Sequence, residues 1–216
     1  LSAGIQESNS IWQNIGDMKN NGMEFDIDAL ILSRKDLQWR VGGNFATNRN
    51  KVLALTPELD RNGAGIQPGD PVREIIKTGL PLGNWYMAEY AGVDTQKGIP
   101  MIYEVRTLED GTTQRTGNII PGTTTNQTAN RMILPGKTSI PKITGGFNTK
   151  LTYKDFSMNM FWNFAAGHYI YNRLRQSLMT PNTGLLTLSS EILTDTWRKP
   201  GDNTKYPMTT YGNSYY

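Results

Sequence analysis

An alternation of apolar and polar residues with period two runs through the segment Leu37–Asn48. The odd positions are Leu37, Trp39, Val41, Gly43, Phe45 and Thr47, and the even positions are Gln38, Arg40, Gly42, Asn44, Ala46 and Asn48. Successive side chains of a β-strand point to opposite faces, so an alternation of this length indicates a long strand. Its two faces must meet different surroundings.

Three further segments show the same alternation, namely Met23–Ser33, Ile143–Tyr153 and Phe156–Ala166. Short polar connections, Arg34–Asp36 and Lys154–Asp155, separate the members of each neighbouring pair. Such connections are typical of tight turns between antiparallel strands. The sequence therefore predicts two hairpins, at about residues 23–48 and 143–168.

Between the hairpins, residues 51–141 hold eight of the 11 prolines and 11 of the 22 glycines. Both residue types weaken a sheet, so we expect mostly loop with short local structure. A second long loop is expected at about residues 172–216. Short turns at one end, long loops at the other and strands of about ten residues are typical of an outer-membrane β-barrel.

The predicted fold is all-β, an antiparallel transmembrane β-barrel segment with short periplasmic turns and long extracellular loops. In such a barrel the apolar face meets lipid, with aromatic girdles at Trp39, Tyr153 and Phe156 and at Phe164 and Tyr169. The polar face meets the lumen. The polar residues expected there are Glu24, Asp26, Asp28, Arg40, Asn44, Asn48, Asn148, Lys150, Asn159 and Asn163.

The strands of a soluble β-sandwich also alternate, so the pattern alone leaves that architecture open. A sandwich would bury the apolar face, including Met158, Met160 and Trp162, against a second sheet. Its strands are usually shorter and seldom flank a loop as long as residues 51–141.

Composition excludes several other classes of protein. The mean hydropathy is −0.50, and no run approaches the roughly 18 apolar residues of a transmembrane helix. The net charge of +3 comes from scattered residues, which favours a mixed surface over a nucleic-acid-binding protein. The absence of cysteine excludes a disulfide framework and a cysteine zinc site.

No residue pattern predicts catalysis, a metal or a cofactor, and we expect the chain not to be an enzyme. His168 is the single histidine and is read as an interfacial or loop residue. The acidic positions Glu24, Asp26 and Asp28 are read as a solvated face, facing cations such as Arg40. Residues 94–98 superficially resemble a calcium loop but lack the ligand pattern of an EF-hand.

Four aromatic residues of the long loop have two possible roles: Trp85, Tyr86, Tyr90 and Tyr103. Aromatic faces stack on sugar rings and apolar side chains, which would make these residues ligand or lid contacts. Alternatively, they pack the loop onto itself.

Six phrases, in order, resemble the SusC/RagA-type TonB-dependent outer-membrane transporters. The first two are NNGMEFDIDALIL (20–32) and WRVGGNFATNRNKVLAL (39–55). The loop phrases are GLPLGNWYMAEYAGVDTQKGIPMIY (79–103) and GNIIPG (117–122). The last two are IPKITGGFNTKLTYKDFSMNMFWNFAAGHYIYN (140–172) and DTWRKPGDNTKYP (195–207).

The resemblance implies that residues 1–216 are an interior part of a larger, plugged barrel whose plug domain and C-terminal strands are absent. It implies active import of an oligosaccharide or oligopeptide across the outer membrane of a Gram-negative bacterium. The implied partners are outer-membrane lipid, a SusD-like surface lipoprotein that closes over the loops, and TonB, which would act through the absent N-terminal region. No nucleic-acid partner is expected. The alternative function is that of a soluble, secreted carbohydrate-binding β-sandwich.

Overall fold

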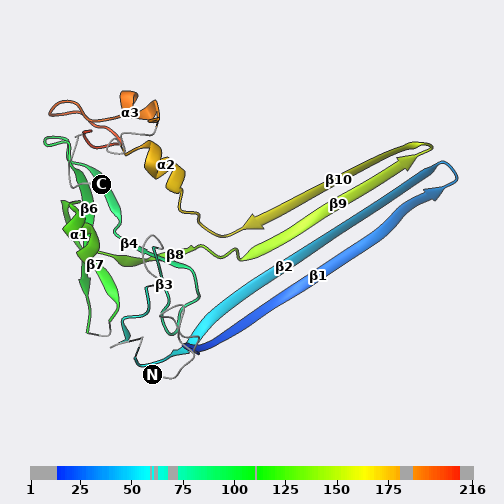
Figure 1. Cartoon of the computed structure of the whole chain (residues 1–216), viewed down its shortest axis with the longest axis horizontal. Coiled ribbons are helices and arrows are strands. Elements are labelled where there is room, and N and C mark those ends of the chain that lie inside the picture. Colours follow the sequence, from blue (N-terminus) through cyan, green and yellow to red (C-terminus); the bar gives the residue numbers. More distant parts are fainter. Residues whose placement is uncertain are drawn as a thin grey trace, which may run out of the picture.

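The computed structural model describes residues 14–58, 60, 63–67, 73–109, 111–180 and 187–209. Four long strands form one sheet, which we call the arm, and it projects from the remaining elements, which we call the head (Figure 1). The arm strands are β1 (Gly16–Arg34), β2 (Leu37–Leu55), β9 (Ile143–Tyr153) and β10 (Phe156–Ala166). Their order is β1-β2-β9-β10, and all neighbours are antiparallel. This arrangement confirms the predicted all-β antiparallel fold.

Both hairpin turns lie at the end of the arm that is far from the head (Figure 1). Lys154 has a φ of 52°, and positive φ at the first central residue is typical of the turns that match strand twist. The Lys154 amide donates to the Asp36 carbonyl over 2.8 Å, which ties the two turns together. The two turns therefore share one end of the sheet, as the sequence predicted.

The register aligns the apolar positions of all four strands on one face. Phe45 lies opposite Phe25 on one side and Gly145 on the other, and Phe164 pairs with Gly145. A register shift between Leu30 and Leu32 rephases β1, so that Leu32 lies opposite Trp39. This β-bulge places Leu32 on the apolar face, whereas Leu30 lies opposite Arg40 on the polar face.

Glycines let side chains lie flat across the middle of the arm. A Cβ built on Gly145 would come within 2.6 Å of both the Asn44 carbonyl oxygen and the Phe164 ring. A Cβ on Gly42 would come within 2.6 Å of the Asn148 side-chain oxygen. Aromatic rings thus cover glycine on the apolar face, and carboxamides cover it on the polar face.

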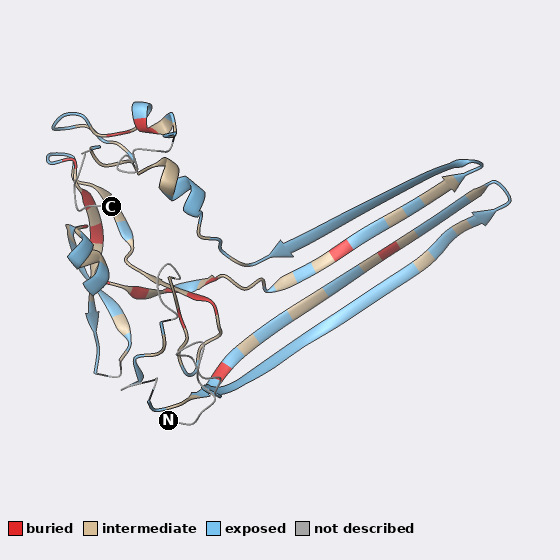
Figure 2. Ribbon diagram, viewed as in Figure 1, coloured by how far each residue is buried: buried red, intermediate tan, exposed pale blue. Residues whose placement is uncertain are grey.

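No described element covers the apolar face of the arm. Phe25 is 62% exposed, Phe45 39% and Phe164 49%. Strands β1 and β10 are exposed along nearly their whole length, whereas β2 and β9 contain partly buried positions (Figure 2). Both edge strands lack a described partner and no described element covers the apolar face, so the described arm is an open sheet rather than one half of a sandwich.

The described part of the head holds two small sheets and three short helices. One sheet has the order β3 (Glu74–Ile75), β4 (Asn84–Met87), β8 (Met132–Thr138), and the other has the order β5 (Tyr90–Val93), β6 (Pro100–Thr107), β7 (Thr113–Pro121). The helices are α1 (Thr124–Ala129), α2 (Arg173–Leu178) and α3 (Glu191–Thr194). No helix in the described part of the chain is long and apolar enough to cross a membrane.

Most of the buried apolar side chains lie in the head. Those in the described residues are Val52, Ile75, Ile102, Met132, Leu134 and Ile192. Residues 51–141, for which the sequence predicted mostly loop, therefore contain sheets with a small core of their own. Val52 anchors this core to the base of the arm, since its amide and carbonyl bond to Leu80 and Gly79.

We expect Gly145→Ala to destabilise the arm more than the matched variant Gly42→Ala. At Gly145 the new methyl group meets a main-chain oxygen and a ring, whereas at Gly42 it meets a carboxamide that can rotate. Overpacking of this kind costs about 1–3 kcal/mol. Urea unfolding of the full-length protein in lipid vesicles measures the difference, and equal losses for the two variants would contradict it.

Candidate functional site

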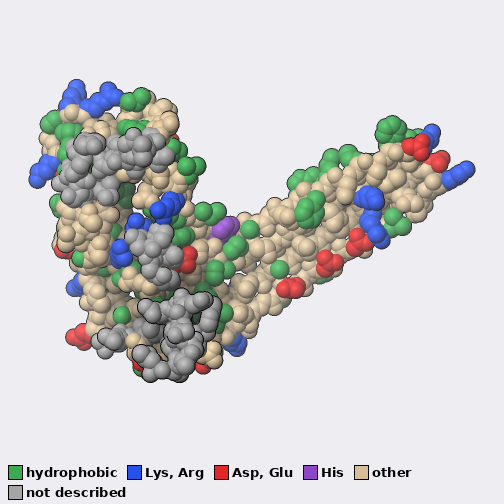
Figure 3. All heavy atoms as spheres, in the orientation of Figure 1, with side chains coloured by type: hydrophobic (Ala, Val, Ile, Leu, Met, Phe, Trp, Pro, Cys, Tyr) green, Lys and Arg blue, Asp and Glu red, His purple; other side chains and the backbone are tan. Residues whose placement is uncertain are grey.

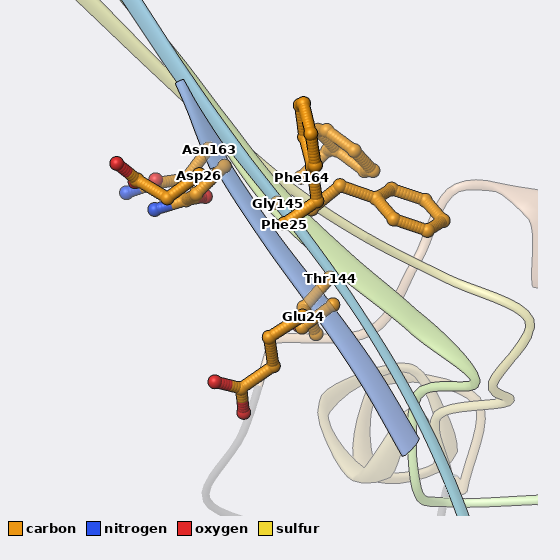
Figure 4. Close-up of a pocket in the computed structure, with 10 residues that line it drawn as sticks. Glu24, Phe25, Asp26, Thr144, Gly145, Asn163 and Phe164 are labelled. Atoms are coloured by element: carbon orange, nitrogen blue, oxygen red, sulfur yellow. The ribbon is translucent and has the colours of Figure 1, made fainter. Parts of the chain in front are cut away.

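The polar residues that the sequence assigned to the lumen lie on one face of the arm. Their register places them side by side: Glu24, Asp26, Asp28, Arg40, Asn44, Asn48, Asn148, Lys150, Asn159 and Asn163. Figure 4 shows the middle of this face, where Glu24, Asp26 and Asn163 point away from the side that carries Phe25 and Phe164. Acidic side chains follow one border of the arm, while hydrophobic side chains gather along the other (Figure 3).

One acidic residue of this face has the cationic partner that the sequence suggested. The Arg40 Nε lies 3.1 Å from the Asp28 Oδ1 across the β1–β2 pair. Both side chains are about half exposed, so the ion pair contributes little to stability. In the described residues, neither Glu24 nor Asp26 has a cation within ion-pair distance.

The four aromatic residues of the long loop lie in different places. The Trp85 indole donates to the Tyr169 carbonyl over 3.1 Å, beyond the end of β10. The Tyr90 hydroxyl donates to the Lys205 carbonyl over 3.0 Å, and the Tyr103 ring lies under the Arg115 guanidinium at 4.3 Å. Tyr86 lines a separate cavity of about 570 Å³. These contacts hold parts of the head together, and no described cavity unites the four residues.

A seam joins the two long segments that lead away from the arm, which we call the first excursion (residues 51–141) and the second excursion (residues 172–216). We use the word seam for the contact between residues 94–98, the turn before β6, and residues 195–208 (Figure 1). The Trp197 indole donates to the Thr95 carbonyl over 2.9 Å. Its ring lies so close to Gly98 that a Cβ there would come within 2.3 Å, and Gly98 also has a φ of +68°. Glycine is thus required at residue 98 for two independent reasons.

The Asp94 side chain builds the turn at residues 94–98. The Asp94 Oδ1 accepts hydrogen bonds from the amides of Gln96 and Lys97, at 2.8 and 3.0 Å. A side chain that satisfies its own following amides forms an Asx turn. Within the described residues, no group of three acidic, histidine or cysteine side chains is arranged to hold a metal ion.

Beside the seam, three side chains form a closed hydrogen-bonded cluster. The Arg175 Nη2 donates to the Glu191 Oε2 and to the Tyr206 hydroxyl, and that hydroxyl donates to the same Glu191 oxygen, each over 2.6 Å. The hydrogen bonds from Tyr206 and Arg175 lower the pKa of the Glu191 carboxyl. The hydrogen bond to Glu191, and to a smaller extent the one to Tyr206, raise the pKa of Arg175.

Sequence reasoning missed this cluster. Tyr206 lies within the quoted phrase at residues 195–207, but Arg175 and Glu191 are 16 residues apart and share no motif. Only the folding of the second excursion brings them together.

A cavity of about 720 Å³ opens between the two excursions beside this cluster. Its wall includes Tyr90, Pro100, Ile102, Lys205, Tyr206 and Pro207. Both long loops therefore contribute residues to one concave surface, which neither loop could form alone.

We expect the second excursion to loosen as the pH falls through the lowered pKa of Glu191. Because the folded-state pKa lies below the ordinary value of 4.5, the carboxylate stabilises the cluster fully above that value. Protonation removes the negative charge that strengthens both hydrogen bonds and attracts the Arg175 guanidinium. A nitroxide attached through Asn203→Cys reports the mobility of the loop by its spectral line width.

The matched variant Glu191→Gln should give a mobile nitroxide spectrum at every pH. If the variant kept the acid transition of the wild type, a group other than Glu191 would control the loop.

Two curated proteins are similar in sequence to most of this chain. No family model matches the chain. TonB-dependent receptor P3 of Formosa agariphila is 30% identical over 207 residues, which cover 90% of this chain and 19% of that protein. TonB-dependent receptor SusC of Bacteroides thetaiotaomicron is 25% identical over 177 residues, covering 79% of this chain and 16% of that protein.

Two solved structures are similar over almost all of the chain. The RagAB peptide transporter superposes with a TM-score of 0.68 at 26% identity, covering 94% of this chain and 21% of that chain. The RagAB peptide importer in its open-open state gives 0.66 at 25% identity, with coverages of 94% and 20%. The chain spans about a fifth of the length of the curated relatives it matches. With its open antiparallel sheet and its uncovered apolar face, the chain belongs to the SusC/RagA-type TonB-dependent receptors of the outer membrane.

Proposed function

We propose that the chain forms part of the barrel wall and the extracellular loops of a nutrient importer in a Gram-negative outer membrane. The observation that carries this proposal is the apolar face of the arm, which exposes large side chains over four adjacent strands. Such a face is stable when it contacts lipid, while the opposite polar face borders a lumen. A soluble β-sandwich would need a second sheet over the apolar face, and no described sheet lies there.

Strand length supports a membrane-spanning arm. Strands β9 and β10 have 11 residues each, close to the 9–11 residues of a tilted transmembrane strand. Strands β1 and β2 have 19 residues each, which is about 60 Å at the usual rise per residue. Their extra length carries the chain beyond the bilayer and into the head.

The ends of the arm define its orientation. Outer-membrane barrels have short turns on the periplasmic side and long loops on the outside. The tight turns at Lys35–Asp36 and Lys154–Asp155 are therefore periplasmic, and the head is extracellular. In this orientation the cavity between the two excursions faces the medium from which nutrients are captured.

The mechanism that we propose is capture followed by energised release. The extracellular loops bind the nutrient beneath a SusD-like lipoprotein, and TonB, acting through a region outside this chain, moves the plug. Transport requires no bond to be made or broken in the cargo, so we propose no enzymatic activity. The relatives carry the names of receptors and transporters.

The proposed substrate is an oligopeptide or an oligosaccharide. Similarity to a structure described as a peptide transporter supports peptides. The aromatic residues Trp85, Tyr86, Tyr90 and Tyr103 remain proposed contacts for the nutrient or the lipoprotein, in addition to the packing contacts described above.

We expect Met160→Arg to destabilise the full-length receptor in lipid, whereas the neighbouring Asn159→Arg is tolerated. Met160 lies on the apolar face in the middle of β10, and Asn159 lies on the polar face. Arginine facing the middle of a bilayer costs about 2–4 kcal/mol. Unfolding in lipid vesicles measures both variants, and equal losses would contradict the assignment of the faces.

Uptake by cells tests the function itself. We expect cells with the full-length receptor to take up a labelled peptide or oligosaccharide, and to lose this uptake when TonB is deleted. In outer-membrane extracts, peptides of this sequence should come from a band several times heavier than 24.2 kDa that shifts on boiling. A soluble protein near 24.2 kDa with no boiling shift would instead support the secreted carbohydrate-binding β-sandwich.

A further inference from the structure

We propose that the cavity between the two excursions binds the carboxylate end of a peptide whose last side chain is apolar. This inference rests on the proposed import function and adds a location and a chemical preference to it. The cavity has a volume of about 720 Å³, which is within the usual range for small-ligand sites. We call it the seam cavity.

One part of the seam cavity is apolar. Ile102, which is only 4% exposed, lines it together with Pro100, Pro207 and Ala88. The Tyr90 side chain is 49% exposed, and its hydroxyl is held by the Lys205 carbonyl, so the ring is fixed at the rim. Such a surface gains free energy by covering an aliphatic or aromatic side chain.

The other part of the seam cavity carries positive charge. Arg175 and Lys205 both line it, and none of the described residues that line it is acidic. Arg175 is neutralised by Glu191, which lies outside the lining. The Lys205 ammonium lies 5.3 Å from the centre of the Tyr206 ring, and within the described residues no carboxylate forms an ion pair with it. Glu191 also interacts with Lys205 electrostatically, without forming a direct ion pair. The two cations of the lining therefore share one carboxylate, which leaves positive charge that an anionic ligand can balance.

The position of Lys205 is fixed by both excursions. Its carbonyl accepts the Tyr90 hydroxyl from the first excursion, and its amide donates to the Asp195 Oδ1 over 3.3 Å in the second. Asp195 is thereby occupied with the main chain of Lys205. A main chain held on both sides presents the side chain at the cavity with less loss of conformational freedom on binding.

The hydrogen-bonding groups of the cavity favour a peptide end over a sugar. A sugar ring needs several donors and acceptors for its hydroxyls, but the Tyr90 hydroxyl binds Lys205 and the Tyr206 hydroxyl binds Glu191. The Gln127 carboxamide donates to the Gly122 carbonyl over 2.7 Å. A single carboxylate beside an apolar side chain matches the Lys205 ammonium, which has no direct ion pair in the described residues, beside an apolar wall.

The test measures binding to the purified full-length receptor, so it does not depend on transport. The probe is the tripeptide Gly-Ala-Leu with a free C-terminal carboxylate, compared with its C-terminal amide by calorimetry. We expect the wild type to bind the free acid about fivefold more tightly than the amide, because the Lys205 ion pair is exposed. Lys205→Met should remove this preference. Ala88→Glu places a negative charge in the lining, so it should weaken binding of the free acid relative to the wild type.

The matched control is Lys199→Met, which removes an exposed cation of the same excursion that does not line the cavity. It should keep the preference of the wild type, and the boiling shift confirms that each variant is folded. Equal binding of acid and amide by the wild type would overturn the proposal, even if uptake depends on TonB. Tighter binding of a uronate oligosaccharide, lost in Lys205→Met, would overturn it in favour of an acidic sugar.

Discussion

The main-chain pairing of β2 with β9 is the interaction on which the rest of the structure depends. It joins two hairpins that are separated in the chain by the whole first excursion, and it aligns Trp39 with Leu151 and Arg40 with Lys150. Because side chains alternate strictly along each strand, this one register decides that apolar residues meet apolar residues across all four strands. A shift by a single residue would place Phe45 on the polar face.

The same pairing gives the head its foundation. It brings the two ends of the first excursion together at the base of the arm, where Val52 bonds to Gly79 and Leu80. The second excursion then docks on the first through the Trp197 ring over Gly98. The two excursions share one cavity, so the segments that connect the arm strands form a defined concave surface.

Much of this architecture could be predicted from the sequence because it depends on local periodicity. The alternation in each segment indicated the strands, their faces and the short turns, since period two is a property of the strand itself. The bulge at Ile31 could not be located, because it depends on the partner strand. The two sheets of the head were also missed, since their strands are short and interrupted by glycine and proline, and their pairing is non-local.

The sequence by itself determined the class of fold, the two faces of the arm and the resemblance to one family of receptors. Only the tertiary structure decided which groups meet in the head. It showed that Trp85, Tyr90 and Tyr103 make separate contacts, and it united Arg175, Glu191 and Tyr206 beside one cavity. The physical reason is distance along the chain: a strand face repeats every second residue, whereas a site built from two excursions leaves no periodic trace in either of them.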